Sequence, residues 1–421
     1  MILFGAGSSI PFNIPGMKGF TEEFLKRNKS NLLNAVRDAI DLSGETVGID
    51  MSFDLESLLS VLSDLSGEAK EKPISLPTAS FLLTHKTTKK EATKEYGKEA
   101  LSTLQELRLF IFNTCMEPIK RGEREGSFGF LNRFYGPLMS VLNGTNLRSI
   151  QSFIRPVYST NWDLCFKTWV DYINEPINDG TTISKQSQPV LDINRLGDTA
   201  TGFAYVSLHG CLDLFRRTSP KGAGRYSTIQ KMPDPIRYYE DKPELLKNVF
   251  MIYPLEAIGY EESVKSPYLD MLIKFRFTLM NEFMVFIIGY SLRDPTIGSI
   301  LEEVIAERIR KGHLNLLSQD LDSRKEEASK NQFKIIVISP DPQELSENLK
   351  KQNLTNLLQT FVPINIRFPR LTDSDFKKKY TQVIERLIEE LIAIHYLDTP
   401  HARDLKNVLK KECNMVITKV Y

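Results

Sequence analysis

MILFGAGSS, residues 1–9, is an apolar run that passes directly into a turn rich in glycine and serine. Three later stretches repeat this arrangement: PVYSTNWD at 156–163, AYVSLHG at 204–210 and VFIIGYSLRD at 285–294. Near-continuous apolar runs are typical of strands that a parallel sheet buries on both faces. Ligands of such sheets bind in the crevice outside the carboxyl ends of the strands. The four stretches therefore predict one cleft that gathers two glycine turns, an asparagine, an aspartate and a histidine.

The composition is typical of a soluble globular protein of two or three domains. Lys and Arg number 54 against 53 Asp and Glu, so the net charge is +1 and gives no indication of nucleic-acid or membrane binding. No apolar run approaches the ~20 residues that a membrane helix needs. The amino terminus also lacks the pattern of a secretory signal. We therefore expect a cytoplasmic protein.

The cysteines predict neither a disulfide framework nor a zinc ribbon. Cys115, Cys165, Cys211 and Cys413 lie far apart and form no Cys-x-x-Cys pair. Reduced thiols are the expected state. Because no pair of His, Cys or carboxylate residues shows ligand spacing, we also expect no metal site.

The pattern along the chain predicts an α/β fold with a Rossmann-like parallel sheet, a helical insertion and a helical C-terminal extension. Further strand-like runs stand at 249–253 and 334–339. Leucines recur at helical spacing over 55–65, after a capping Ser52, whereas 66–100 is polar and predicts mainly loop. The helix after the fourth stretch has the clearest boundaries, since Asp294 can cap it and Gly312 can end it.

We predict three parts: a discontinuous Rossmann-like domain at 1–30 plus 150–345, a helical insertion at 31–149, and an extension at 346–421. The extension contains an amphipathic helix from Phe376 to Ile394. Its apolar stripe either packs on the protein's own core or forms contacts with another subunit or a partner.

The first glycine turn permits the backbone to approach a pyrophosphate closely, with N–H groups turned toward the anion. An ordinary tight turn explains Gly5-Ala6-Gly7 equally well. The full dinucleotide fingerprint Gly-x-Gly-x-x-Gly is incomplete, because Ile10 occupies the third glycine position. No second strand ends in an acid about 20 residues further on. Hydride transfer is therefore disfavoured.

The middle two stretches carry the candidate catalytic groups. Asn161 can hold a ribose hydroxyl or orient a water, and Asp163 can accept a bond from an amide or stabilise a cation; as an alternative, both residues simply cap the next helix. His209 is the best candidate base because an imidazole titrates near neutral pH. Gly210 beside it removes a side chain that would crowd a ligand.

In the fourth stretch, Gly289-Tyr290-Ser291 combines a close-approach turn with a hydroxyl suited to ribose or phosphate. Arg293 either reaches a phosphate or forms a surface ion pair.

In this order, the motifs resemble those of the sirtuin family. The sirtuin pattern Gly-Ala-Gly-x-Ser followed by Ile-Pro is similar to residues 5–9 with Ile14-Pro15, and Thr-Gln-Asn-Ile-Asp is similar to 159–163. The sirtuin His-Gly corresponds to 209–210 and Gly-Thr-Ser-Leu to 289–292.

The resemblance implies that Asn161 binds the nicotinamide ribose and positions water, that Asp163 holds the nicotinamide carboxamide and that His209 is the general base. It further implies that the cofactor-binding residues are Gly5, Ala6, Gly7, Ser8, Ser9, Pro15, Thr160, Gly210, Gly289, Tyr290 and Ser291.

Two departures distinguish the chain from deacylating sirtuins: the four zinc cysteines are absent, and Gly16-Met17-Lys18 replaces the Asp-Phe-Arg that follows Ile-Pro. With its longer GYSLRDP motif, the chain is more similar to the sirtuin-like NAD hydrolases of bacterial anti-phage defence. That resemblance implies cleavage of NAD, as substrate, to nicotinamide and ADP-ribose, and a homo-oligomer with a HerA-type ATPase as possible partner. Alternatives are an NAD-dependent protein deacylase, a non-catalytic nucleotide-binding subunit, or a nuclease within an ATPase complex.

Overall fold

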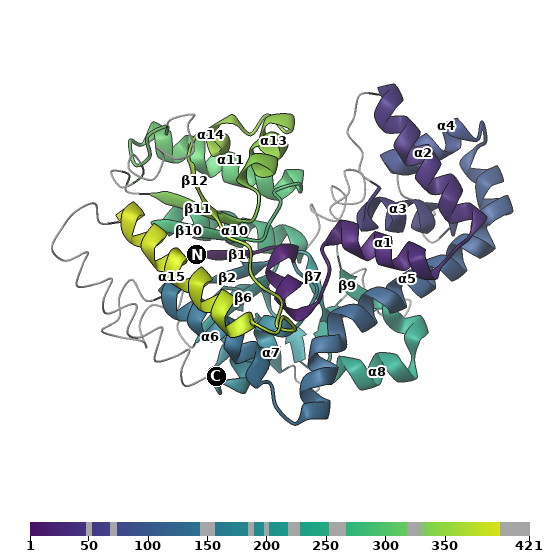
Figure 1. The fold of residues 1–421 in the computed structure, drawn as a ribbon. Coiled ribbons are helices and arrows are strands. Elements are labelled where there is room, and N and C mark those ends of the chain that lie inside the picture. Colours follow the sequence, from purple (N-terminus) through teal and green to yellow (C-terminus); the bar gives the residue numbers. More distant parts are fainter. Residues whose placement is uncertain are drawn as a thin grey trace.

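The computed structural model describes residues 1–47, 53–67, 74–143, 156–183, 189–197, 202–217, 228–251, 267–317, 328, 331 and 333–395. Within these ranges the central feature is a parallel sheet of seven strands (Figure 1). In spatial order the strands are β12 (Phe361–Asn365), β11 (Lys334–Ser339), β10 (Met284–Ile288), β1 (Ile2–Phe4), β2 (Val157–Ser159), β6 (Phe203–Ser207) and β3 (Ile177–Asn178). This confirms the predicted α/β class and Rossmann-like sheet.

Helices cover both faces of this sheet, as two neighbouring side chains demonstrate. Phe4 packs on Tyr135 of α6 (Gly129–Asn143) and on Phe166 of α7 (Cys165–Tyr172). Tyr158 of β2 pairs with Leu3, the residue before Phe4 in β1. Its hydroxyl forms a hydrogen bond of 2.6 Å with Thr278 of α10 (Tyr268–Asn281). Because successive strand residues point to opposite faces, α10 and the α6–α7 pair lie on opposite sides.

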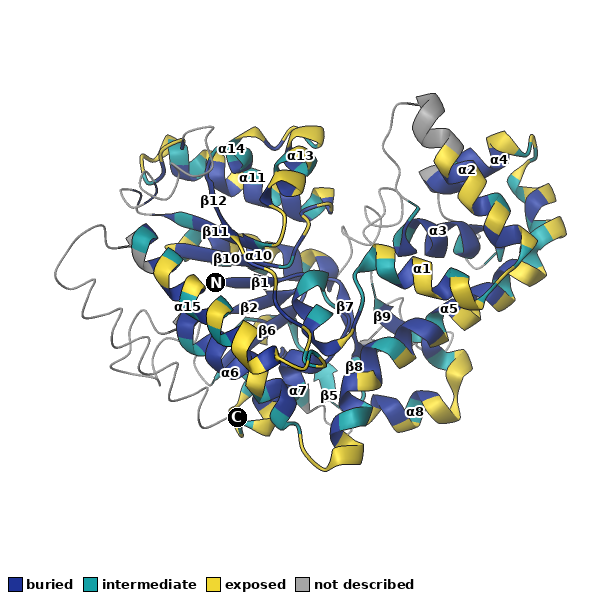
Figure 2. Cartoon of the chain, viewed as in Figure 1, coloured by how far each residue is buried: buried dark blue, intermediate teal, exposed yellow. Residues whose placement is uncertain are grey.

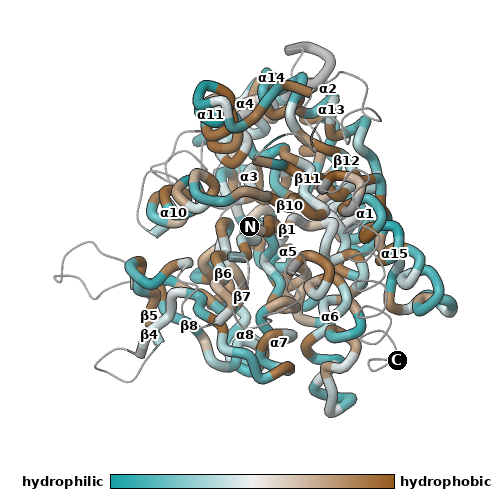
Figure 3. The backbone as a smooth tube through the Cα atoms, turned by 90° about the vertical axis from the view of Figure 1, so that its left-hand side faces the viewer, coloured by the Kyte–Doolittle hydropathy of each residue, from teal (hydrophilic) through white to brown (hydrophobic). Residues whose placement is uncertain are grey.

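The strands are apolar because both faces are covered. Every residue of β1, β2, β6 and β10 is buried, and Figure 2 shows these strands in dark blue while helices expose their outer faces. In Figure 3, β10 and β11 pass through the interior among the hydrophobic segments. Burying one side chain such as Phe286 contributes about 1.5–3 kcal/mol.

A second sheet was not predicted. Among the described residues it has five antiparallel strands in the order β4 (Thr181–Ile183), β5 (Pro189–Leu191), β8 (Thr228–Lys231), β7 (Gly210–Arg217) and β9 (Val249–Met251). The run at 249–253, predicted as a parallel strand, contributes β9 to this sheet instead. A short apolar run does not reveal its partner, which explains the error. Two short helices adjoin this sheet: α8 (Pro235–Asp241) and η4 (Pro243–Asn248).

The insertion is helical, as predicted, and lies to one side of the sheet (Figure 1). It contains α2 (Asn31–Val47), α3 (Leu55–Leu65), α4 (Leu76–Thr84) and α5 (Lys89–Glu125), next to α1 (Met17–Arg27). The prediction of loop over 66–100 was wrong for α4 and the start of α5, whose Thr88–Glu91 capping box sets the helix start. The observed cap of α3 is Asp54; Ser52 lies outside the described residues.

The Rossmann-like sheet continues beyond residue 345, which corrects the predicted boundary. After α11 (Pro295–Arg310) and β11, the chain forms α13 (Pro342–Lys351), α14 (Thr355–Leu358) and then β12, which pairs in parallel with β11. β12 contains Pro363, and a proline in a sequence argues against a central strand. An edge strand tolerates proline, and β12 lies at the edge of this sheet.

The last described helix, α15 (Phe376–His395), packs on the protein's own core. Its Tyr380 hydroxyl donates to the Phe134 carbonyl of α6, and Ile384 and Leu387 are fully buried. This confirms the first of the two predicted roles for its apolar stripe.

Two further expectations concern composition. Within the described ranges, no helix is both long enough and apolar enough to cross a bilayer. Cys115, Cys165 and Cys211 are free and buried, as expected of reduced thiols, while Cys413 lies outside the described residues.

Candidate functional site

The four motifs meet at one edge of the parallel sheet. They follow β10, β1, β2 and β6, which are consecutive neighbours and all parallel, so their carboxyl ends lie side by side. A cavity of about 340 Å³ opens at this edge. The predicted site residues that line it are Ala6, Gly7, Ser9, Pro15, Thr160, Asn161, Asp163, His209, Gly289, Tyr290 and Ser291.

Three predicted residues, Gly5, Ser8 and Gly210, are not among those lining the cavity. A Cβ on Gly5 would lie 2.4 Å from the Tyr290 Cα, so this glycine lets the first and fourth motifs pack together. Gly210 has φ +74°, and a Cβ there would lie 1.8 Å from the Phe250 carbonyl oxygen. Gly210 thus makes room for β9, and its predicted role of leaving room for a ligand stays a prediction.

The two glycine turns also bond to each other. Gly5 N–H donates to the Ile288 carbonyl at 2.9 Å, and Gly7 N–H donates to the Gly289 carbonyl at 2.7 Å. Gly289 has φ +62°, which favours glycine. The turns thus form one rigid wall of the cavity.

Asn161 is held in one orientation by two serines. Its Nδ2 lies 3.0 Å from Ser8 Oγ and 2.8 Å from Ser9 Oγ. Each hydroxyl already donates its single hydrogen elsewhere, Ser8 to the Gly5 carbonyl at 2.8 Å and Ser9 to Asp163 Oδ2 at 2.6 Å. Both serines must therefore accept from the amide nitrogen, which fixes Oδ1 as the remaining group.

That oxygen is an unsatisfied acceptor. Asn161 Oδ1 is buried and has no hydrogen-bond partner among the described residues, although Asn161 lines the cavity. A buried polar atom without a partner is costly, so a hydroxyl or water in the cavity would stabilise it.

Asp163 is already occupied by the protein itself. Oδ2 accepts from Ser9, and Oδ1 accepts from the Cys165 N–H at 2.9 Å, at the start of α7. Asp163 is not the N-cap of α7, which is Leu164 without a side-chain cap bond, although it accepts from the first N–H of that helix. Its carboxylate orients Asn161 through Ser9, and holding a nicotinamide amide stays a prediction.

His209 is paired with a carboxylate that was predicted only as a helix cap. Its Nε2 lies 2.7 Å from Asp294 Oδ2, and both side chains are almost fully buried. The other oxygen, Oδ1, accepts from the Thr296 and Ile297 N–H groups and caps α11 as predicted. Because a carboxylate only accepts, Nε2 carries a proton, so Nδ1 is the ring nitrogen that can serve as a base.

The insertion also contributes to the cavity. Asp54 and Glu56 from the start of α3 and Cys115 from α5 line it, and none belongs to a motif. Burial, assisted by Asp54 and Asp294 and opposed by Arg293, raises the pKa of Glu56 to about 8. No local sequence signal identified these residues, because tertiary packing brings them to the cleft.

Arg293 forms ion pairs, one of the two roles predicted for it, and it also lines the cavity. Its guanidinium lies 3.8 Å from Asp54 and 3.5 Å from Glu344, and its side chain is 46% exposed. The pairs connect the insertion with the Rossmann-like sheet and contribute little in water.

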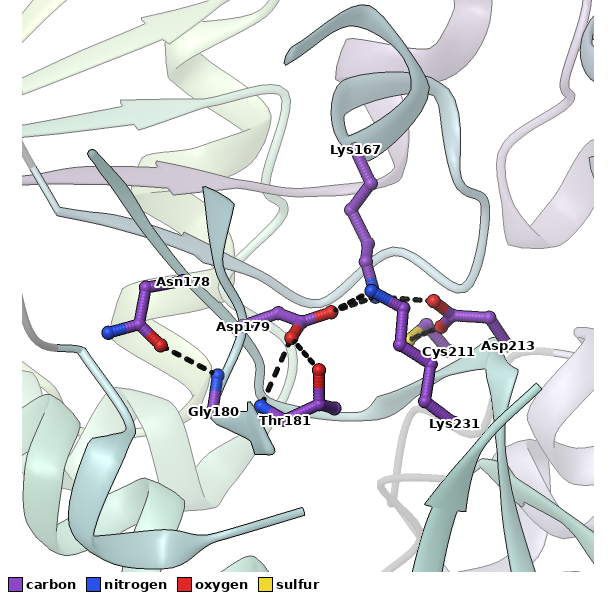
Figure 4. Close-up of polar contacts among 8 residues, drawn as sticks. All are labelled: Lys167, Asn178, Asp179, Gly180, Thr181, Cys211, Asp213 and Lys231. Atoms are coloured by element: carbon purple, nitrogen blue, oxygen red, sulfur yellow. Dashed lines mark hydrogen bonds and ion pairs between the residues drawn. The ribbon is translucent and has the colours of Figure 1, made fainter. Parts of the chain in front are cut away.

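A buried ionic network supports β7, which follows His209 directly (Figure 4). Lys167 of α7 reaches between Asp213 of β7 at 2.5 Å and Asp179 at 2.9 Å, and Lys231 of β8 also binds Asp179 at 2.7 Å. Burial alone would raise the pKa of Asp179, but the two ammonium groups hold it well below its ordinary range. The network joins α7 to the second sheet and so fixes the position of the His209 turn.

Residues 155–338 match the family model described as SIR2-like domain. The match supports a sirtuin-like family. It covers less than half of the chain, including the motifs with Asn161, His209 and Tyr290, and it indicates NAD-related activity. No curated protein matches the chain. Among the described residues, no group of three or more His, Cys, Asp or Glu is placed to hold a metal ion.

Proposed function

We propose that this protein is an NAD glycohydrolase, which cleaves NAD to nicotinamide and ADP-ribose. The observation that carries the proposal is the unsatisfied Oδ1 of Asn161 in the same cavity as the carboxylate-paired His209. One group is a fixed acceptor and the other is an oriented base. The SIR2-like match supports NAD as the ligand.

The reaction breaks the bond between the ribose carbon and the pyridinium nitrogen, and nicotinamide leaves with the bonding electron pair. The sugar carbon then carries cationic, oxocarbenium-like character, and water adds to it. Asn161 Oδ1 accepts a hydrogen bond from a ribose hydroxyl or from this water. His209 Nδ1 takes the proton that the water loses, and Asp294 stabilises the resulting imidazolium.

The test is to incubate the purified chain with NAD and to separate the products by chromatography. We expect stoichiometric nicotinamide and ADP-ribose, with most turnover lost in Asn161→Ala and in His209→Ala. His85→Ala is the matched control, because His85 ends α4 and does not line the cavity. Wild-type NAD loss in either site variant would refute the assignment, and nicotinamide release that requires an acetylated peptide would indicate a deacylase.

We further propose, on the motif resemblance alone, that this activity depletes NAD as the effector of an anti-phage defence system. The same resemblance suggests a cytoplasmic homo-oligomer and a HerA-type ATPase partner. Mass photometry of the chain, with and without a candidate ATPase, tests the assembly. An NAD assay in infected cells tests the role: unchanged NAD after infection would contradict it.

A further inference from the structure

Glu56 is the one acid that the insertion's α3 helix places within the cavity from its first turn. It shares the cavity with Tyr290 of the fourth motif and with Asp294, the partner of His209. Their mutual electrostatic influence is also direct, since Glu56 is among the groups that raise the pKa of Tyr290. A helix outside the four motifs thus contributes a carboxyl group to the site.

The Tyr290 hydroxyl gives independent evidence that a ligand group belongs here. Tyr290 is only 8% exposed, and its buried hydroxyl has no hydrogen-bond partner among the described residues. Buried hydroxyls of folded proteins are normally satisfied. A ligand oxygen in the cavity would accept this hydrogen bond.

The surroundings of Glu56 favour its neutral, protonated form. Burial is the main cause, and the carboxylates of Asp54 and Asp294 add to it, so the pKa rises to about 8 despite the nearby Arg293. At pH 7 the carboxyl group is therefore roughly nine-tenths protonated. It then has an O–H group to donate, as Tyr290 has.

Other ionisable groups face the same space from the surrounding elements. Lys18 of α1 and Glu344 of α13 line the cavity, and His209 is bound to Asp294. Burial raises the pKa of Tyr290 and of nearby Tyr268 on α10 well above 10, so neither phenol ionises below pH 9. Of the groups around Tyr290 whose pKa is raised, Glu56 is the one with a pKa between 7 and 9.

We propose that Glu56 binds the dinucleotide directly, donating a hydrogen bond to a phosphate oxygen together with the Tyr290 hydroxyl. This inference rests on the proposed NAD chemistry and adds a substrate-binding residue from the insertion. Two neutral O–H donors beside the Arg293 guanidinium suit an anionic oxygen. An ionised Glu56 beside Asp54 and Asp294 would instead repel a phosphate.

The consequence is that binding weakens when Glu56 loses its proton. Between pH 7 and pH 9 the protonated fraction of a group with a pKa of about 8 falls from roughly nine-tenths to roughly one-tenth. Affinity for the phosphate-bearing ligand should therefore fall about tenfold over this range. Glutamine keeps the size and a neutral N–H donor, so Glu56→Gln should remove this dependence.

The experiment measures ADP-ribose binding by calorimetry at pH 7 and pH 9, because this probe carries the pyrophosphate but lacks the scissile nicotinamide bond. We expect about tenfold weaker binding at pH 9 for the wild type and for Glu344→Gln, which neutralises an exposed carboxylate of the same cavity. We expect similar affinity at both pH values for Glu56→Gln. Glu56→Ala should bind weakly at both, and a melting curve for each variant verifies folding.

The possible results separate two failures. If the wild type binds ADP-ribose with the same affinity at both pH values, or if Glu56→Gln keeps the tenfold change, Glu56 does not donate to the ligand and the further inference is wrong. If the wild type neither binds ADP-ribose nor cleaves NAD at either pH, the proposed function fails and the inference fails with it.

Discussion

Asp294→Asn separates the two roles that one carboxylate has in this structure. Oδ1 caps α11, and Oδ2 accepts from His209 Nε2 at 2.7 Å. Asparagine caps helices about as well as aspartate, so the fold should persist. With its oxygen on the helix, the new amide nitrogen faces Nε2, and two donors oppose each other. The imidazole must then carry its proton on Nδ1, which removes the base.

The expected loss in kcat is about 10²–10⁴-fold, the usual contribution of a positioned general base. Asp294→Ala should lose the same activity and, in addition, about 1 kcal/mol of stability through the missing cap. The assay follows nicotinamide release against pH, together with thermal unfolding of each variant. Asp341→Asn is the matched control, because Asp341 caps α13 and does not line the cavity.

The outcome that contradicts this reasoning is specific. If Asp294→Asn keeps wild-type kcat with an unchanged pH profile, the carboxylate does not set the tautomer of His209. If it loses activity only because it unfolds, its melting temperature will fall with that of the alanine variant.

Three further predictions concern the supports of the site. Lys167→Met removes the ammonium group that pairs with the buried Asp213 and leaves Asp179 with Lys231 alone, so it should cost about 3–5 kcal/mol in urea unfolding. Because the pKa of Asp179 is lowered on folding, its contribution to wild-type stability is present above the ordinary carboxyl pKa and is lost as the pH falls below about 4. Ser9→Ala leaves Asn161 held by Ser8 alone and should lower kcat about 10-fold or more, whereas wild-type kcat would count against this role of Ser9. Because Asp163 Oδ2 also loses its buried donor, the melting temperature should fall as well. Gly210→Ala should lower the melting temperature through its φ of +74° and its contact with β9, which an unchanged melting curve would disprove.

The motif-bearing half of the site was accessible to sequence reasoning because its geometry follows from a general rule. Parallel neighbouring strands present their carboxyl ends at one edge, so the sequence alone was enough to assign Asn161, His209 and Tyr290 to one cleft. The partner of β9 and the strand β12 were missed for a different reason. A short apolar run does not state which strand it joins, and Pro363 is acceptable only because β12 lies at the edge of the sheet.

Asp294 shows how a correct local prediction can miss a function. The sequence Asp-Pro before an apolar helix predicts an N-cap, and the structure confirms it. A cap needs one carboxylate oxygen, and only the fold shows that the second oxygen meets His209, 85 residues earlier in the chain. When a carboxylate caps a helix beside a cleft, its second oxygen is free to bind another residue, and the local sequence does not predict which residue that is.

Glu56 extends this argument from hydrogen bonds to acidity. In isolation, a glutamate in the first turn of a helix is stabilised as an anion by the helix dipole. Here burial and the carboxylates of Asp54 and Asp294 outweigh that effect and raise its pKa to about 8. These causes come from α3 itself and from the loop before α11, which meet only when the insertion packs beside the sheet. The protonation state of the cavity is therefore a property of the contact between the insertion and the Rossmann-like sheet, and changes at that contact should alter ligand binding while the four motifs remain intact.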